Sequence, residues 1–371
     1  MAHAFILAGE VSGDKLAASL MRAQSKTITR WTGMGGPAMA AEGLVSIADY
    51  EQLHIIGVWD ALLAYQRLKK LLNHLVTTIC DTRPDVIYTV DSKGFSLKLA
   101  QKLRARMKEQ GWSAPIIHMV APTIWAYGAG RKTAFAEAFD EMLCLFPQEA
   151  PLWDDTNLKA HFIGHPAAYH ANRPVRHKDE ICQLLVLPGS RKGEIDACLP
   201  PFLAAVQRLS SQFACEVTIA TTNAMAPHLS KMIANQTIPL SIVTGPDSFQ
   251  KAVGASHLMM AASGTVTLET ALAGLPGVTA YRLNWLTTMI MKQRFKLADP
   301  ILPNILLDKA LYPFFLNQDA KADVIAQQLA GMWEAYPSIH AHHHEEAERL
   351  QKMLTGGHAS FEDAIAQALS K

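Results

Sequence analysis

Short apolar runs that end in a glycine-bearing loop and then lead into a helical stretch recur along this chain, and no other feature restricts its fold as much. In the clearest example, residues 257–262 have the length and composition of a buried strand. The Ser-Gly-Thr at 263–265 breaks that strand and can cap the helical stretch 266–273, which Gly274 and Pro276 end. Strands that alternate with helices pair in parallel, so the repeat predicts an α/β fold.

The repeat runs through both halves of the chain, with a break between them. Strand candidates lie at 4–7, 85–90, 116–120, 141–146, 160–163, 183–187, 215–220, 239–243 and 257–262. Residues 164–180 have no apolar periodicity, which is typical of a linker. We therefore expect an N-terminal Rossmann-like domain at 1–165, a linker at 166–181, a C-terminal Rossmann-like domain at 182–335, and terminal helices at 336–371. Those helices either return to the N-terminal domain or dock on a partner chain.

The composition excludes several classes of protein. The 371 residues suffice for two domains, and 49% hydrophobic residues support large cores. A net charge of +1 argues against a protein that binds nucleic acid through bulk charge. The five cysteines form no C-x-x-C pair, which indicates reduced thiols in a cytoplasmic protein. We find neither a secretory signal nor an apolar run long enough for a transmembrane helix.

The turn formed by Ser263, Gly264 and Thr265 is a candidate phosphate site. A glycine-bearing turn before a helix leaves backbone N–H groups free at the positive end of the helix dipole. Glu269 lies about one turn further into the helix, where it can accept hydrogen bonds from a sugar diol. An ordinary βα turn with a surface glutamate is the structural alternative.

A second loop of this kind, Gly189-Ser190-Arg191, follows the strand at 183–187. A cation beside free N–H groups can neutralise a diphosphate as it leaves, although a solvated turn has the same composition. Further along the chain, Asn304 can read the edge of a base or a ribose.

Acidic residues follow two strands of the first half. Glu10 comes after the strand at 4–7, and Asp91 after the strand at 85–90, so both lie where ligands of α/β sheets bind. Asp91 is a candidate general base, or alternatively a cap of the helix at 95–108. Ser12 either caps the next helix or lines the same site.

Other features carry less weight. Residues 33–38 match the G-x-G-x-x-A pattern, but no convincing apolar strand precedes them, so a tight turn explains them as well. The histidines at 340 and 342–344 lie in a Glu-rich helix and are more typical of a solvated face than of a metal site. The segments 55–75 and 285–296 combine apolar and basic residues, which suits either packing on the sheet or contact with an anionic membrane.

Together the two halves indicate a nucleotide-sugar transferase. The sequence holds no zinc signature, P-loop, G-x-S-x-G motif or D-x-D motif of metal-dependent glycosyltransferases. Helix dipoles and Arg191 can then stabilise the departing diphosphate, while a carboxylate of the other domain activates the acceptor hydroxyl.

Motifs spread over residues 5–310 resemble the lipid-A-disaccharide synthase family of glycosyltransferases. In chain order they are AGEVSGD (8–14), GGPAM (35–39), PDV (84–86), PTIWA (122–126), FIGH (162–165), LPGSR (187–191), ASGT (262–265), LE (268–269), YR (281–282) and LPN (302–304). The residues beyond 310 match only in length and helical character.

The resemblance implies a GT-B fold, in which two Rossmann-like domains face each other across a cleft, with no metal or cofactor. It implies an inverting transferase that condenses UDP-2,3-diacylglucosamine with 2,3-diacylglucosamine 1-phosphate (lipid X) into a β-1,6 disaccharide and releases UDP. Such an enzyme is peripheral on the cytoplasmic face of the inner membrane. Its partners are these substrates and an anionic membrane surface, with no nucleic acid and with a homodimer possible.

Carried over residue by residue, the family pattern makes Asp91 the base for the acceptor 6-hydroxyl and places Glu10 and Ser12 on the acceptor side. The residues implied for UDP are Gly189, Ser190, Arg191, Ser263, Gly264, Thr265, Glu269 and Asn304. The acceptor side departs from the family pattern D-x-P-D-F-N, since Gly94 and Ser96 stand at its last Asp and Asn. Two alternatives stay open: a UDP-sugar-binding homologue with lost or altered acceptor chemistry, and an isomerase like UDP-N-acetylglucosamine 2-epimerase.

Overall fold

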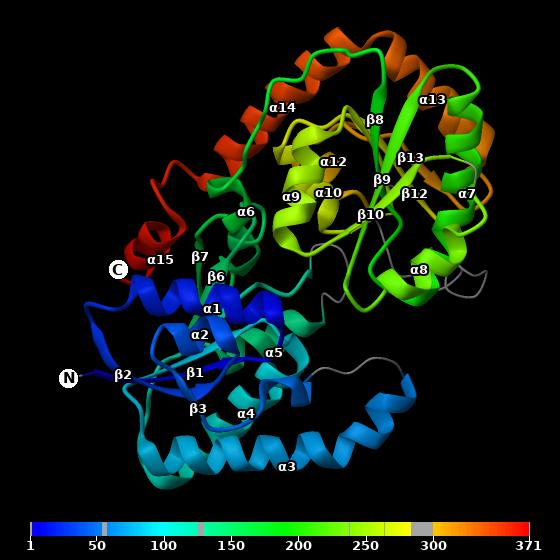
Figure 1. Ribbon diagram of the computed structural model, residues 1–371. Helices are drawn as coiled ribbons and strands as arrows, with labels where there is room; N and C mark the ends of the chain where they lie inside the picture. Colours follow the sequence, from blue (N-terminus) through cyan, green and yellow to red (C-terminus); the bar gives the residue numbers. More distant parts are fainter. Residues whose placement is uncertain are drawn as a thin grey trace. The chain divides into compact units, whose positions relative to one another are not determined.

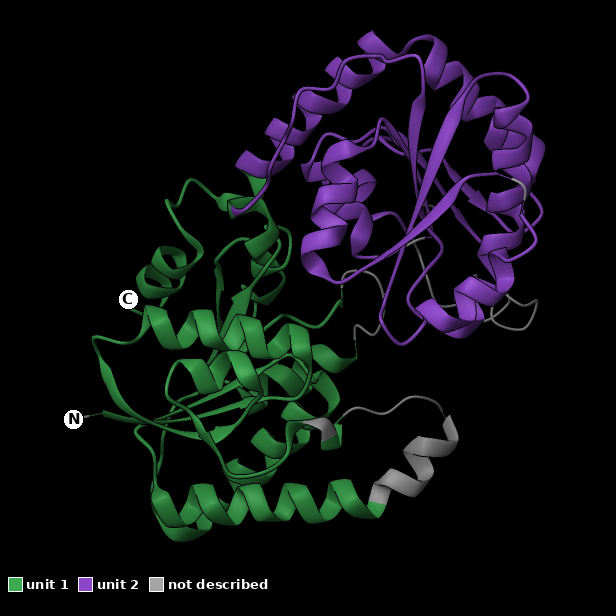
Figure 2. Ribbon diagram, viewed as in Figure 1, with its two compact units in different colours: residues 1–169, 353–371 green, residues 170–352 purple. Residues whose placement is uncertain are grey.

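The computed structural model describes residues 2–53, 58–124, 130–236, 238–262, 264–282 and 300–370. It contains two compact units, drawn in different colours in Figure 2. Unit 1 combines Met1–Tyr169 with Met353–Lys371, and unit 2 is His170–Lys352. Each unit is built on one parallel sheet with helices packed on it, so the predicted α/β class with two Rossmann-like domains is confirmed.

Unit 1 has a seven-stranded sheet in the order β3-β2-β1-β4-β5-β6-β7. Its strands are β1 (Ala2–Ala8), β2 (Ile28–Met34), β3 (Val45–Ser46), β4 (Val86–Val90), β5 (Ile116–Met119), β6 (Glu141–Cys144) and β7 (Lys159–Phe162). Its helices are α1 (Val11–Ala23), α2 (Pro37–Ala41), α3 (Val58–Thr82), α4 (Lys93–Gln110), α5 (Arg131–Ala138), α6 (Pro166–Tyr169) and α15 (Phe361–Leu369), with 3-10 turns η1 (Tyr50–Leu53) and η2 (Ala150–Trp153).

Alternate side chains of β1 supply the two hydrophobic cores of unit 1. Phe5 and Leu7 pack with residues of α3 and α4, whereas Ala4, Ile6 and Ala8 pack with residues of α1 and α15. Successive side chains of a strand point to opposite faces, so a sheet covered on both sides requires a continuous apolar run. Figure 1 shows α1 on one side of this sheet, with α3 and α4 on the other.

Unit 2 has a six-stranded parallel sheet in the order β10-β9-β8-β11-β12-β13. Its strands are β8 (Cys182–Leu187), β9 (Cys215–Thr221), β10 (Leu240–Thr244), β11 (Leu258–Ala261), β12 (Gly277–Tyr281) and β13 (Phe314–Leu316). Its helices are α7 (Lys192–Ser210), α8 (Ala226–Ile233), α9 (Pro246–Ala255), α10 (Val266–Leu272), α12 (Leu302–Leu307), α13 (Ala322–Glu334) and α14 (Tyr336–Thr355), the last of which extends into unit 1. The main core joins the sheet to α7 and α13.

The chain passes from unit 1 to unit 2 inside the segment predicted as a linker at 166–181. Arg176 in this segment is buried, and its guanidinium donates to the carbonyls of Val253 at 3.0 Å and Ala273 at 3.2 Å. These carbonyls lie at the C-terminal ends of α9 and α10, where the helix dipole favours a cation. The Arg176 backbone N–H donates to Nε2 of His340 in α14 at 2.9 Å. This segment is therefore held firmly against unit 2.

The chain returns to unit 1 between Lys352 and Met353, inside α14. We expected the terminal helices to begin at 336 as a segment separate from the C-terminal domain, whereas the first turns of α14 belong to unit 2. His340 and His343 are buried there, so the predicted solvated face is wrong for these two side chains.

Across the described ranges, none of the helices combines the length and the hydropathy needed to cross a membrane.

Candidate functional site

The strand order of each sheet reverses at one point, and the loops that follow the strands there carry predicted site residues, although Asn304 lies in α12. In unit 2 the order reverses between β8 and β11, and in unit 1 between β1 and β4. The loops after two such strands diverge to opposite sides of the sheet and leave a crevice, which is where ligands of doubly wound folds bind. In unit 2, Ala262 N–H donates to Leu187 O at 2.7 Å, so the loops after β8 and β11 start side by side.

The loop between β8 and α7 is organised around the carboxylate of Glu194. Oε2 of Glu194 accepts from the Ser190 N–H at 3.1 Å, and Oε1 accepts from Arg191 Nη1 and from the Tyr281 hydroxyl, both at 3.1 Å. Gly189 has a φ of +115°, and a Cβ there would lie 2.6 Å from the Glu194 Cβ. This position therefore requires glycine. Sequence reasoning gave no role to Glu194 or to Tyr281.

A backbone N–H, a guanidinium and a hydroxyl thus converge on one carboxylate, and donors of these kinds are those that bind oxyanions. The Arg191 side chain is 80% exposed and is thus accessible to a ligand. Burial raises the pKa of Tyr281 to about 12, and the nearby Glu194 charge adds to the rise, so the hydroxyl stays a proton donor at neutral pH. The loop also lies at the N-terminus of the long helix α7, where the dipole favours negative charge.

The loop between β11 and α10 is open at its tip. Gly264 and Thr265 are exposed, and a Cβ on Gly264 would meet no described atom within 4 Å. Glu269, in the first turn of α10, is half-buried and accepts from Gln250 Nε2 at 3.0 Å. Ser263 lies outside the described residues, as do the aromatic segment 125–127, the basic segment 285–296 and the start of the segment 55–75.

Asn304 makes structural contacts in unit 2. Its side chain is buried, Nδ2 donates to Tyr312 O at 2.8 Å, and Oδ1 accepts from Tyr312 N–H at 2.9 Å. The nitrogen and the oxygen of the amide thus both bind the backbone of Tyr312, which follows α12. The assignment of Asn304 to UDP stays a prediction that these contacts do not favour.

At the switch point of unit 1, Glu10 and Asp91 occupy adjoining loops. Glu10 is the exposed N-cap residue of α1, and Ser12 is exposed in the first turn. Asp91 follows β4 with a φ of +52°, and Ser92 has a φ of +44°. A Cβ on Gly9 would lie 2.7 Å from Ser92 Oγ, so the two loops touch. The structure therefore brings together the carboxyl ends of β1 and β4, as predicted for parallel strands.

Asp91 is held by its main chain while its carboxylate remains partly exposed. Its N–H donates to Met119 O at 3.0 Å, and its carbonyl accepts from the buried Ser96 Oγ at 2.8 Å. Lys93 Nζ lies 3.9 Å from Asp91 Oδ1. Two successive non-glycine residues in the left-handed region cost roughly 1–3 kcal/mol each, and such strain is typical of functional sites.

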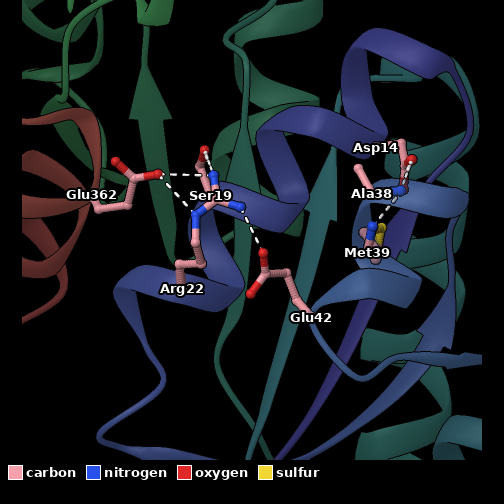
Figure 3. Close-up of polar contacts among 7 residues, drawn as sticks. All are labelled: Asp14, Ser19, Arg22, Ala38, Met39, Glu42 and Glu362. Carbon is pink, nitrogen blue, oxygen red and sulfur yellow. Dashed lines mark hydrogen bonds and ion pairs between the residues drawn. The ribbon is translucent and has the colours of Figure 1, made fainter.

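Asp14, in the first turn of α1, fixes the glycine-rich turn at 35–38. Its carboxylate is buried and accepts from the N–H group of Gly36 at 2.8 Å. It also accepts from the N–H groups of Ala38 at 2.8 Å and Met39 at 3.2 Å (Figure 3). It thus caps α2 from another helix. A Cβ on Gly33 would lie 1.8 Å from Ile6 O, so the G-x-G-x-x-A pattern serves close backbone packing here.

Comparison with known proteins decides between the classes that this geometry allows. The family model described as lipid-A-disaccharide synthetase matches residues 4–368. This chain belongs to that family. The lipid-A-disaccharide synthase of Idiomarina loihiensis is 34% identical over 345 residues, which cover 89% of each chain. The predicted family membership is confirmed, and the chain is a glycosyltransferase.

Solved structures resemble this family member in fold. The glycotransferase of kitacinnamycin has a TM-score of 0.62 at 14% identity, covering 100% of this chain and 98% of that one. A UDP-GlcNAc 2-epimerase from Neisseria meningitidis bound to UDP-GlcNAc has a TM-score of 0.61 at 11% identity, covering 99% of each. The GT-B fold is confirmed. Since both classes share the architecture, sequence family and not fold separates the transferase from the epimerase.

Proposed function

We propose that this chain is a metal-independent, inverting glycosyltransferase that joins UDP-2,3-diacylglucosamine to 2,3-diacylglucosamine 1-phosphate and releases UDP. The observation that carries the proposal is the family match over residues 4–368. The oxyanion-binding loop around Arg191 supports it, since a diphosphate leaving group needs such a loop. Within the described ranges, no cluster of three or more His, Cys, Asp or Glu side chains is arranged to bind a metal ion.

In this mechanism the carboxylate of Asp91 takes the proton of the acceptor 6-hydroxyl as its oxygen attacks C1 of the donor sugar. The bond between C1 and the diphosphate oxygen breaks, and the electron pair leaves with UDP. Arg191 and the N–H of Ser190 stabilise the charge that develops on the diphosphate. Attack on the face opposite to UDP inverts C1 and gives a β linkage. The turn at Gly264 and Thr265, with Glu269, contributes to UDP binding.

We further propose that the protein works at an anionic membrane surface on the cytoplasmic side. The exposed cations Arg67, Lys69 and Lys70 on α3 support this, because each basic residue near such a surface contributes about 1 kcal/mol of attraction. Flotation with vesicles that contain phosphatidylglycerol should retain the protein at low salt and release it at high salt.

Release of UDP from donor and acceptor tests the catalytic proposal. With EDTA present, the wild-type protein should release UDP, and Asp91→Asn should lower kcat at least 100-fold because the amide cannot take a proton. UDP affinity measured by calorimetry should stay unchanged in Asp91→Asn and fall in Arg191→Ala. Asp81→Asn, an exposed acid at the end of α3, is the matched control.

Each other outcome points to a different conclusion. Full turnover in Asp91→Asn would remove the base role from this residue but leave the transferase. UDP binding without turnover would indicate a binding protein. Conversion of UDP-N-acetylglucosamine into its 2-epimer would indicate the isomerase.

A further inference from the structure

A pocket of about 680 Å³ lies between α3 and α4 in unit 1, and one end of it reaches the loops that carry the proposed acceptor site. Glu10, Ser92 and Gly94 line that end. The proposed base Asp91 is the immediate neighbour of Ser92. The pocket therefore extends away from the position where the acceptor hydroxyl has to be activated.

Three lysines line the pocket, Lys69 from α3 and Lys98 and Lys102 from α4. Lys98 and Lys102 are one helical turn apart, so both side chains lie on one face of α4. Lys102 Nζ donates to Asn73 Oδ1 at 2.8 Å, and in the part of the chain that the structure describes, Lys69 and Lys98 form no ion pair. Glu10 is the one acidic residue among the described residues that line the pocket. The pocket thus has an excess of positive charge.

The remaining wall is apolar. Leu72 is buried, and Leu53, Leu68 and Phe95 are half-buried around the same space. Leu53 and Phe95 also pack on the core that underlies α3 and α4, which gives the wall a rigid support. A small inorganic anion would use the lysines but not this wall. Cations above an apolar wall fit a ligand that carries both a phosphate and a hydrocarbon chain.

We propose that this pocket binds the acceptor, with Lys69, Lys98 and Lys102 holding its phosphate and Leu68, Leu72 and Phe95 contacting an acyl chain. The inference rests on the proposed function, because the acceptor named there is an acylated sugar phosphate. A phosphomonoester carries about −1.5 to −2 charges at pH 7, and lysine binds phosphate as a point charge. The lysines would thereby select the phosphorylated acceptor over the same lipid without phosphate.

Comparing two acceptors tests this assignment. The double variant Lys98→Gln with Lys102→Gln is assayed in detergent micelles with 2,3-diacylglucosamine 1-phosphate and with 2,3-diacylglucosamine. We expect KM for the phosphorylated acceptor to rise at least 10-fold, and kcat/KM for the acceptor without phosphate to stay within 2-fold. UDP affinity should not change. Lys108→Gln, an exposed lysine of α4 outside the pocket, is the matched control.

Equal losses on both acceptors, or no loss on either, would overturn the proposal. It would also fail if the double variant lost binding to phosphatidylglycerol vesicles but kept its KM for micellar acceptor, because the lysines would then bind membrane lipid. If the wild-type protein released no UDP, the proposed function would fail instead. Direct titration of the phosphorylated acceptor into the wild-type protein and the double variant would then still decide whether the pocket binds it.

Discussion

The Glu194 carboxylate accepts hydrogen bonds from the same donors that, in the proposed function, bind a diphosphate. The N–H of Ser190, the guanidinium of Arg191 and the hydroxyl of Tyr281 all donate to it. A diphosphate that enters this loop has to displace the carboxylate or share its donors. Because Arg191 is largely exposed, its side chain can turn to the ligand at little cost in packing. Under the proposed function, Glu194 thus orders the loop before UDP arrives.

Asp14 is a buried carboxylate on which the stability of unit 1 depends. In Asp14→Ala, three N–H groups at the start of α2 lose their acceptor, and unpaired buried groups cost about 1–3 kcal/mol each. We expect a loss of at least 3 kcal/mol in the free energy of unfolding, measured by urea denaturation. Asp14→Asn keeps one oxygen acceptor and should lose about half as much. A change below about 1 kcal/mol in Asp14→Ala would contradict this account.

At the scale of elements, the helix α15 is held on α1 by both charge and apolar contact. Arg22 donates to Glu42 at 2.7 Å and to Glu362 at 2.9 Å (Figure 3), but its side chain is 45% exposed. Exposed ion pairs contribute about 0–1 kcal/mol each. Phe361 is 2% exposed in the core below, together with Ile365. Apolar burial therefore dominates the attachment.

Substitutions in α15 and α1 should separate these contributions. Phe361→Ala should lower the free energy of unfolding by about 3–5 kcal/mol, because it removes a buried ring and leaves a cavity. Arg22→Ala breaks both ion pairs and should cost no more than about 2 kcal/mol. Urea denaturation followed by circular dichroism measures both. Losses of similar size in the two variants would show that the ion pairs hold the helix.

The elements that sequence reasoning found are those whose pattern is local. β1, β4, β8 and β11 are continuous apolar runs, because helices cover both faces of their sheets. β2, with the sequence ITRWTGM, was missed because several of its side chains are exposed. The buried strand β12, with the sequence GVTAY, was missed because Gly277 and Thr279 interrupt its apolar run, and β3 and β13 are short strands at sheet edges. The helix α1 begins at Val11, although Gly13 in its first turn has a low helical propensity.

The candidate site, like the fold, could be predicted where its residues form a local sequence pattern. Glycine-bearing loops at strand ends mark Gly189, Arg191 and Asp91 in the sequence, and the parallel sheets bring these loops to the switch points. The contact between Glu194 and Tyr281 joins residues 87 positions apart, so no local pattern indicates it. The buried amide of Asn304 likewise depends on a turn that only the folded chain forms.

For the whole molecule, buried neutral histidines should make stability depend on pH. Burial lowers the pKa of His118 in unit 1 to about 3 and that of His343 in unit 2 to about 4. In the unfolded chain both titrate near 6.5. Below pH 6.5 the unfolded state therefore binds more protons than the folded state, and acidification favours unfolding until the folded-state pKa values are reached.

Each of these two histidines should cost roughly 1.4 kcal/mol of stability per pH unit between pH 6.5 and 4. Urea denaturation at pH 7.5, 6.0 and 5.0 should show the decline, and His343→Gln should flatten it. The exposed His342→Gln is the matched control. Equal stability at pH 7.5 and 5.0 would mean that neither histidine is neutral and buried in solution.

Unit 1 is completed by residues 353–371, which the ribosome adds only after all of unit 2. Its first 169 residues are thus synthesised with the apolar surface of α1 uncovered. More than half of the polypeptide is added before α15 covers this surface. The first unit to be translated is consequently the last to be finished. A nascent chain of this kind needs protection by chaperones for longer than one whose units are contiguous, and expressing the N-terminal half alone should give an aggregating product.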